Sequence, residues 1–179
     1  MTSLRKVAVT GPESTGKSAL CKGLAEHFNT RFVPEFAREY LDKLDRPYVE
    51  EDIVSIARGQ LAHEYRLAEA MKKTGEPLLF CDTELIVTKI WSLHKYHRCD
   101  PWILEKIKAN PYDLYLLCDV DLAWEPDPLR EHPDLRNYFF NWYRQELSDY
   151  GFPFVIVRGV QQERLNNAIV AVNNFFTAD

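Results

Sequence analysis

One eight-residue segment near the start of the chain restricts the possible folds more than any other feature. Residues 11–18 read G-P-E-S-T-G-K-S and match the pattern G-x-x-x-x-G-K-[ST] at every specified position. An apolar run precedes the segment, and a stretch of helical period follows it. A glycine-containing turn without a function can imitate this pattern, but the strand and helix on its two sides favour a phosphate-binding loop (P-loop).

The chemistry of the P-loop predicts a site for ATP with Mg²⁺. Its glycines let the backbone pass close to phosphate groups, its N–H groups point inward, and the following helix adds the positive end of its dipole. Lys17 is expected to reach the β- and γ-phosphates, and Ser18 to bind magnesium. The residues expected to bind the nucleotide are Gly11, Glu13, Ser14, Thr15, Gly16, Lys17, Ser18 and Ala19.

Short apolar runs alternate with longer stretches of helical period along the chain. The predicted strands cover residues 6–10, 31–33, 78–82, 114–118 and 154–157. The predicted helices cover residues 17–28, 36–44, 49–73, 85–95, 102–108, 135–150 and 162–176. Because parallel strands need crossover connections, the alternation predicts an α/β fold with a parallel five-stranded sheet and helices on both faces. Ligands should bind beyond the carboxyl ends of the strands.

Composition limits the class of protein further. A chain of 179 residues fits a single domain, 1–179, and 46% hydrophobic with 27% charged residues is typical of a folded globular protein. The formal net charge of −5 provides no positive field for nucleic acid. No segment approaches the roughly 20 apolar residues of a membrane helix, and the first residues lack a secretory signal pattern. We therefore expect a cytoplasmic protein whose partners include neither nucleic acid nor membrane.

The cysteines and histidines favour neither disulfide bonds nor a metal centre. The cysteines have no C-x-x-C spacing, so we expect reduced thiols that are mostly buried. Two histidines and one cysteine lie close together in the sequence, but a zinc site would need a fourth ligand or a defined open position. The residues concerned are Cys21, Cys81, Cys99 and Cys118, with His94 and His97 beside the third.

Two carboxylates follow predicted strands and are candidates for chemistry. Asp82 ends the apolar run 78–82, where P-loop enzymes place an acid on the magnesium side, although an acid there also caps helices. Glu35 follows the run 31–33 and is suited to accept the proton of an attacking hydroxyl, with Arg38 nearby to hold an acceptor or a phosphate. The alternative is a solvated helix start in which Glu35 pairs loosely with Arg38.

The segment 119–136 interrupts the alternation of strands and helices. Its three prolines exclude one continuous helix. Because it follows the carboxyl end of a strand it is a candidate lid, although a plain surface loop with an aromatic anchor is the simpler interpretation. An arginine there can neutralise a transferring phosphoryl group, and a tryptophan can stack on a planar ring. The side chains with such chemistry are Trp124, Asp127, Arg130 and Arg136.

With these residues assembled, the chain resembles the ribosylnicotinamide kinase domain of NadR-type proteins, a family of P-loop kinases. The resemblance covers most of the chain. Its carriers are the P-loop and the segments P-E-F-A-R-E-Y (residues 34–40), C-D-T (81–83) and W-E-P-D-P-L-R (124–130). The P-loop indicates only an NTPase, whereas the other three segments together point to this family. The resemblance implies a nucleoside-kinase-like fold with a lid.

Together with the residue chemistry above, the resemblance gives each candidate residue an expected role. The residues expected to take part in catalysis are Lys17, Glu35, Asp82 and Arg130, and those expected to bind the acceptor are Glu35, Arg38, Asp82 and Trp124. Ser18 and Asp82 are expected to bind the metal, and the loop at Gly159 is expected to contact the adenine. Bifunctional members of the family also carry an adenylyltransferase domain with an H-x-G-H motif, and none of the five histidines here lies in that pattern. Pro128 stands where the family pattern has a glycine.

The expected activity is transfer of the terminal phosphoryl group of ATP to the ribose hydroxyl of nicotinamide riboside, which gives nicotinamide mononucleotide. Two alternatives remain open from the sequence: a kinase for another nucleoside, and a nucleotide-dependent regulatory ATPase or switch. The sequence alone does not choose between Glu35 and Asp82 as the base, and it does not indicate an oligomeric state.

Overall fold

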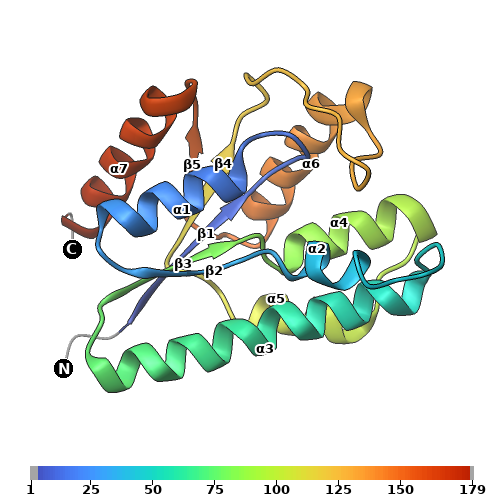
Figure 1. The fold of residues 1–179 in the computed structure, drawn as a ribbon, viewed down its shortest axis with the longest axis horizontal. Coiled ribbons are helices and arrows are strands. Elements are labelled where there is room, and N and C mark those ends of the chain that lie inside the picture. The colour runs from blue at the N-terminus through green and yellow to red at the C-terminus, as the bar shows by residue number, and fades with distance from the viewer. Residues whose placement is uncertain (1–3, 178–179) are drawn as a thin grey trace.

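The computed structural model describes residues 4–177 and has one five-stranded parallel sheet at its centre (Figure 1). The strands lie in the order β2-β3-β1-β4-β5, and every neighbouring pair is parallel. Four predicted strands have the observed bounds, and the first begins one residue earlier. The strands are β1 (Arg5–Thr10), β2 (Arg31–Val33), β3 (Leu78–Asp82), β4 (Leu114–Cys118) and β5 (Phe154–Val157).

Helices cover both faces of the sheet, which confirms the predicted fold class (Figure 1). The predicted helices are all present, although most of their ends are shifted slightly. They are α1 (Lys17–His27), α2 (Phe36–Leu41), α3 (Glu50–Thr74), α4 (Leu85–Tyr96), α5 (Pro101–Ala109), α6 (Arg136–Asp149) and α7 (Gln161–Thr177), with a 3₁₀ turn η1 (Pro133–Leu135). The largest difference is at α2, where Leu44 N–H bonds the carbonyl of Leu41, so a tighter turn replaces the last predicted α-helical turn.

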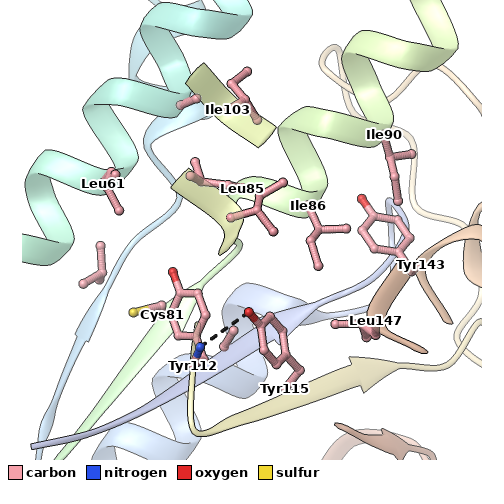
Figure 2. Packing of buried hydrophobic residues seen from close by; sticks show 14 of the residues in the cluster. Leu61, Cys81, Leu85, Ile86, Ile90, Ile103, Tyr112, Tyr115, Tyr143 and Leu147 are labelled. Carbon is pink, nitrogen blue, oxygen red and sulfur yellow. Dashed lines mark hydrogen bonds between the residues drawn. The ribbon is translucent and has the colours of Figure 1, made fainter. Parts of the chain in front are cut away.

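The alternation of side chains along each strand divides the core into two layers. In β1, Ala8 packs with the layer under α3, α4, α5 and α6, whereas Val7 and Val9 pack with the layer under α1 and α7. Figure 2 shows the first layer, where Ile86 and Ile90 of α4 face Tyr143 and Leu147 of α6. Both faces of the inner strands are buried, which is why their sequences are continuous apolar runs.

The long helix α3 follows from local sequence signals. Acidic residues occupy its first turn, and Lys72 and Lys73 occupy its last turn, as the helix dipole favours. The Asp52 carboxylate accepts the N–H of Val49 at 2.8 Å, and Gly75 ends the helix with a φ of 75°.

The state of the four cysteines agrees with the expectation from the sequence. All four cysteines are free; Cys21, Cys81 and Cys118 are buried, as predicted, and Cys99 is half-buried. Across residues 4–177, no helix is both long and apolar enough to cross a membrane. The described residues contain no group of three or more histidine, cysteine, aspartate or glutamate side chains arranged to hold a metal ion.

Candidate nucleotide and acceptor site

The P-loop joins the end of β1 to the start of α1 and depends on two glycines. Gly11 has a φ of 132°, and a Cβ there would lie 3.0 Å from the carbonyl oxygen of Cys118 on the neighbouring strand β4. Gly16 has a φ of 74°, and a Cβ there would lie 2.9 Å from Leu122. Any larger residue would strain the backbone and push against these neighbours, so the loop keeps its path only with glycine at both positions.

The P-loop side chains hold the loop in shape through contacts within the loop. The Thr15 hydroxyl donates to the carbonyl of Pro12 at 2.8 Å, and the Lys17 ammonium donates to the same carbonyl at 2.7 Å. Both residues line a cavity of about 650 Å³ at the carboxyl edge of the sheet. The Lys17 ammonium therefore already lies at the loop, close to the place where a phosphate would bind.

Asp82 ends β3, directly beside β1, where it is paired in register with Val9. Its side chain is only 2% exposed, and its Oδ1 has no hydrogen-bond partner in the described part of the chain. Burial raises the pKa of this carboxyl to about 6; Ser18 and Lys17 oppose the rise, and the charge of Glu35 adds to it. A buried, unpaired carboxylate oxygen beside a hydroxyl is a donor set that suits Mg²⁺, so Ser18 and Asp82 fit the ion expected from the sequence.

Thr83 and Glu84, the two residues after Asp82, line the cavity. Thr83 has a φ of 68°, which is uncommon for a β-branched residue, and it is buried. Glu84 is 3% exposed and accepts hydrogen bonds from the Thr10 hydroxyl and the Ile86 N–H. Burial raises the pKa of Glu84 to about 7, while these hydrogen bonds oppose the rise. Asp82 and Glu84 are thus two buried acids on one short turn.

Glu35 and Arg38, at the start of α2, also line the cavity. The Glu35 carboxylate makes no hydrogen bond or ion pair with any residue between 4 and 177. Arg38 instead pairs with Asp127 of the segment 119–136, with Nη2 and Oδ2 3.1 Å apart. This hydrogen bond raises the pKa of the Arg38 guanidinium. Glu35 therefore has an unpaired carboxylate, whereas the Arg38 guanidinium is already paired with Asp127.

The segment 119–136, yellow to orange in Figure 1, is attached to the P-loop. The Glu13 carboxylate accepts the backbone N–H groups of Glu131 and His132, each at 3.1 Å. The Ser14 hydroxyl accepts the N–H of Glu125 at 2.9 Å and lies 3.4 Å from the Arg130 guanidinium. The segment thus rests on the residues that are expected to bind phosphate, and we call it the candidate lid.

Not every residue predicted for the site lines the cavity. Lys17, Glu35, Arg38 and Arg130 do so, with residues 11–19. Trp124 does not; its ring lies under the Arg136 guanidinium, 5.8 Å from ring centroid to Cζ. Gly159 is also outside the cavity, with a φ of 98° and its N–H bonded to Asp121 at 2.7 Å. Asp82 is buried and does not itself line the cavity, although Thr83 and Glu84 beside it do. The catalytic and binding roles of all the predicted site residues stay predictions.

Several cavity residues were not anticipated from the sequence. Gln60 of α3 is buried; its side-chain oxygen accepts the Phe36 N–H at 2.8 Å, and its amide donates to the Asp82 carbonyl at 3.3 Å. It thereby joins α2 to the end of β3. The sequence signal that could have identified Gln60 is its position as a polar residue on the apolar face of α3. Tyr48, Trp91, Lys95 and Glu131 form another part of the wall, and no local pattern indicates their proximity.

Arg164 of α7 is a buried arginine that binds backbone carbonyls next to the site. Its guanidinium is 3% exposed and donates to the carbonyls of Gly159 at 2.8 Å, Thr15 at 3.1 Å and Asp119 at 3.3 Å. It also pairs with the Asp121 carboxylate. One buried side chain therefore connects the P-loop, the segment after β4 and the loop before α7.

Comparison with known proteins places this geometry in a family context. A family model described as an AAA domain matches residues 6–164. The trifunctional NAD biosynthesis/regulator protein NadR of Salmonella typhimurium is 27% identical over 163 residues, which are 87% of this chain and 38% of that protein. The NadR protein of Escherichia coli is 28% identical over 162 residues, which are 86% of this chain and 38% of that protein. The chain thus spans well under half the length of these relatives.

Solved structures agree with the sequence comparison. Crystal structures of a NadR protein, one with NAD and AMP-PNP and one with NR, superpose with a TM-score of 0.80 at 25% identity, over 97% of this chain and 50% of that chain. A deoxyadenosine kinase from M. mycoides superposes with a TM-score of 0.63 at 14% identity, over 94% of this chain and 99% of that chain, which shows a shared fold alone. The predicted resemblance to NadR-type proteins and the nucleoside-kinase-like P-loop fold are confirmed.

Proposed function

Since the chain belongs to the AAA domain family of P-loop proteins, we propose that it is an ATP-dependent kinase that phosphorylates the ribose hydroxyl of nicotinamide riboside and produces nicotinamide mononucleotide. The single observation that carries this proposal is the presence of Lys17 and the free Glu35 carboxylate on the walls of one cavity of about 650 Å³. The likeness to NadR structures crystallised with NR and with an ATP analogue supports the choice of acceptor.

Different residues of the cavity have different roles in the proposed phosphoryl transfer. Lys17 and the P-loop N–H groups bind the phosphates, and Arg130 approaches from the candidate lid. A magnesium ion held by Ser18 and Asp82 would supply further neutralisation of phosphate charge. The acceptor hydroxyl oxygen forms a bond to the γ-phosphorus, the bond from that phosphorus to the β–γ bridging oxygen breaks, and ADP leaves. Glu35 takes the hydroxyl proton, because Asp82 is committed to the metal side.

An acceptor panel tests the proposal. Nicotinamide riboside, adenosine, uridine, cytidine and thymidine are each incubated with Mg-ATP, and the products are identified by mass. We expect nicotinamide riboside to give the highest kcat/KM, and ATP consumption to depend on the acceptor. A better nucleoside would overturn the choice of acceptor and leave the kinase in place. Slow ATP hydrolysis that no acceptor increases would instead favour a regulatory switch.

A further inference from the structure

One wall of the cavity holds a compact group of aromatic and charged side chains that the phosphoryl-transfer scheme does not use. Tyr48 comes from the segment before α3, Trp91 and Lys95 come from successive turns of α4, and Glu131 comes from the candidate lid. We call these four residues the ring-site group. They are brought together from three separate parts of the chain.

The ring-site group is connected by direct contacts. The Trp91 indole N–H donates to the Tyr48 hydroxyl at 2.9 Å, and that hydroxyl donates to the Glu131 carboxylate at 2.8 Å. The two aromatic rings meet edge to face, with centroids 4.9 Å apart. Burial raises the pKa of the Tyr48 hydroxyl, so it stays protonated and keeps donating to Glu131. Tyr48 therefore presents a fixed ring face beside a fixed carboxylate.

Lys95 occupies the position that this ring and this carboxylate favour for a cation. Its ammonium lies 3.6 Å from the centroid of the Tyr48 ring and 3.6 Å from the Glu131 carboxylate. An aromatic face and a carboxylate both attract positive charge. The lysine side chain is 36% exposed and unbranched, so its ammonium can move into water without disturbing the core.

We propose that Lys95 marks the subsite for the acceptor's base, and that a positively charged planar ring binds against Tyr48 beside Glu131 in place of the Lys95 ammonium. This inference rests on the proposed function, whose acceptor carries a pyridinium ring. A flat cation gains both stacking on Tyr48 and attraction to Glu131, whereas a neutral ring gains only the stacking. A ring bearing a carboxylate fits less well, because it would meet the Glu131 carboxylate.

Two acceptors that differ in charge and hardly in shape test the inference. Nicotinamide riboside carries a pyridinium cation, and dihydronicotinamide riboside is its neutral reduced form. Calorimetry with the Mg²⁺ complex of AMP-PNP gives a Kd for each. We expect wild-type protein to bind the cation about 3- to 30-fold more tightly than the neutral form, the range that cation–π and carboxylate attraction provide.

Variants of the ring-site group should change this ratio in opposite directions. Lys95→Met removes the competing ammonium and should increase the preference for the cation by roughly 2- to 5-fold, mainly through a lower Kd for nicotinamide riboside. Glu131→Gln keeps an acceptor for the Tyr48 hydroxyl, removes the charge, and should reduce the preference to the smaller factor that the Tyr48 ring face alone provides. Lys72→Met, on the far end of α3 and paired with Glu69, is the matched control and should leave both Kd values unchanged.

The outcomes separate this inference from the proposed function. Turnover of nicotinamide riboside with equal Kd values for the two acceptors, or a Lys95→Met variant that binds the cation more weakly, overturns the inference and leaves the kinase intact. Failure to phosphorylate nicotinamide riboside overturns the proposed function, and the ratio of Kd values still decides whether the wall is a cation subsite.

Discussion

If Asp82 binds magnesium as proposed, burial of its carboxylate lowers the stability of the protein without the metal, and replacement by asparagine should separate binding from stability. The carboxyl is 2% exposed, and its Oδ1 lacks a hydrogen-bond partner among residues 4–177. Without the magnesium ion that we propose it binds, this carboxylate therefore carries a buried negative charge with one oxygen unpaired. Asparagine has nearly the same shape and no charge, so Asp82→Asn should stabilise the ligand-free protein and impair phosphoryl transfer.

The magnitude follows from the pKa of Asp82. Burial raises it from 3.8 to about 6, so the folded protein binds this proton more tightly than the unfolded chain does. Stability consequently falls as the pH rises from about 4 to about 6 and stays reduced above that window. The full displacement corresponds to about 3 kcal/mol at about 1.36 kcal/mol per pH unit. Allowing for the polar amide that remains buried, Asp82→Asn should gain about 2 kcal/mol at about pH 8.

Urea unfolding in the presence of a chelator measures this gain. Wild type and Asp82→Asn are unfolded at about pH 4.5 and about pH 8, on either side of most of the Asp82 transition, and Asp45→Asn serves as a control at an exposed position. The advantage of Asp82→Asn should be large at the higher pH and nearly absent at the lower, while Asp45→Asn should follow wild type at both. A variant that is no more stable than wild type at the higher pH would refute the argument that burial of this charge is costly.

Three further predictions concern the site. Lys17→Ala should keep the fold and reduce kcat strongly, because Lys17 supplies phosphate charge pairing and no core packing; wild-type turnover by a folded variant would contradict the P-loop assignment. Glu35→Gln should lower kcat by up to roughly 10²–10⁴-fold with little change in the KM for Mg-ATP, whereas Asp82→Asn should also raise the magnesium requirement; kcat measured against magnesium concentration separates them, and wild-type kcat for Glu35→Gln would transfer the base role to Asp82. Arg164→Met should lower the free energy of unfolding by about 3 kcal/mol, because three carbonyls and the Asp121 carboxylate lose their donor, and it should raise the KM for ATP; urea unfolding and ATP titrations check this, and an unchanged KM would show that Arg164 does not position the P-loop.

Much of the fold could be predicted because its signals are local. The strands are continuous apolar runs, since the inner strands of a parallel sheet are buried on both faces, and the helices carry their own periodicity and end signals. The order β2-β3-β1-β4-β5 was not predicted, because crossover connections of similar length allow several orders. The shortened α2 depends on the tighter turn at Leu44, which no residue pattern indicates.

The candidate site divides in the same way. The P-loop and the acids at strand ends were identified from adjacent residues, and the parallel sheet brings them to one edge. Trp124 was predicted from its residue type, but the direction of its ring depends on a contact with Arg136, at the start of α6. Tyr48 and Trp91 were missed because their contact joins segments that no sequence period relates.

The position of Arg164 affects the order in which the molecule can be completed during synthesis. The P-loop leaves the ribosome before α7 does, yet its Thr15 carbonyl receives a donor from Arg164 of that later helix. The packing of α1 against α7 shares this dependence, because Leu24 and Ala168 belong to one buried layer. Domains begin to fold from the N-terminal side as they emerge. A nascent chain can therefore form β1 and α1 first, but the loop between them reaches its final support only after α7 has been translated.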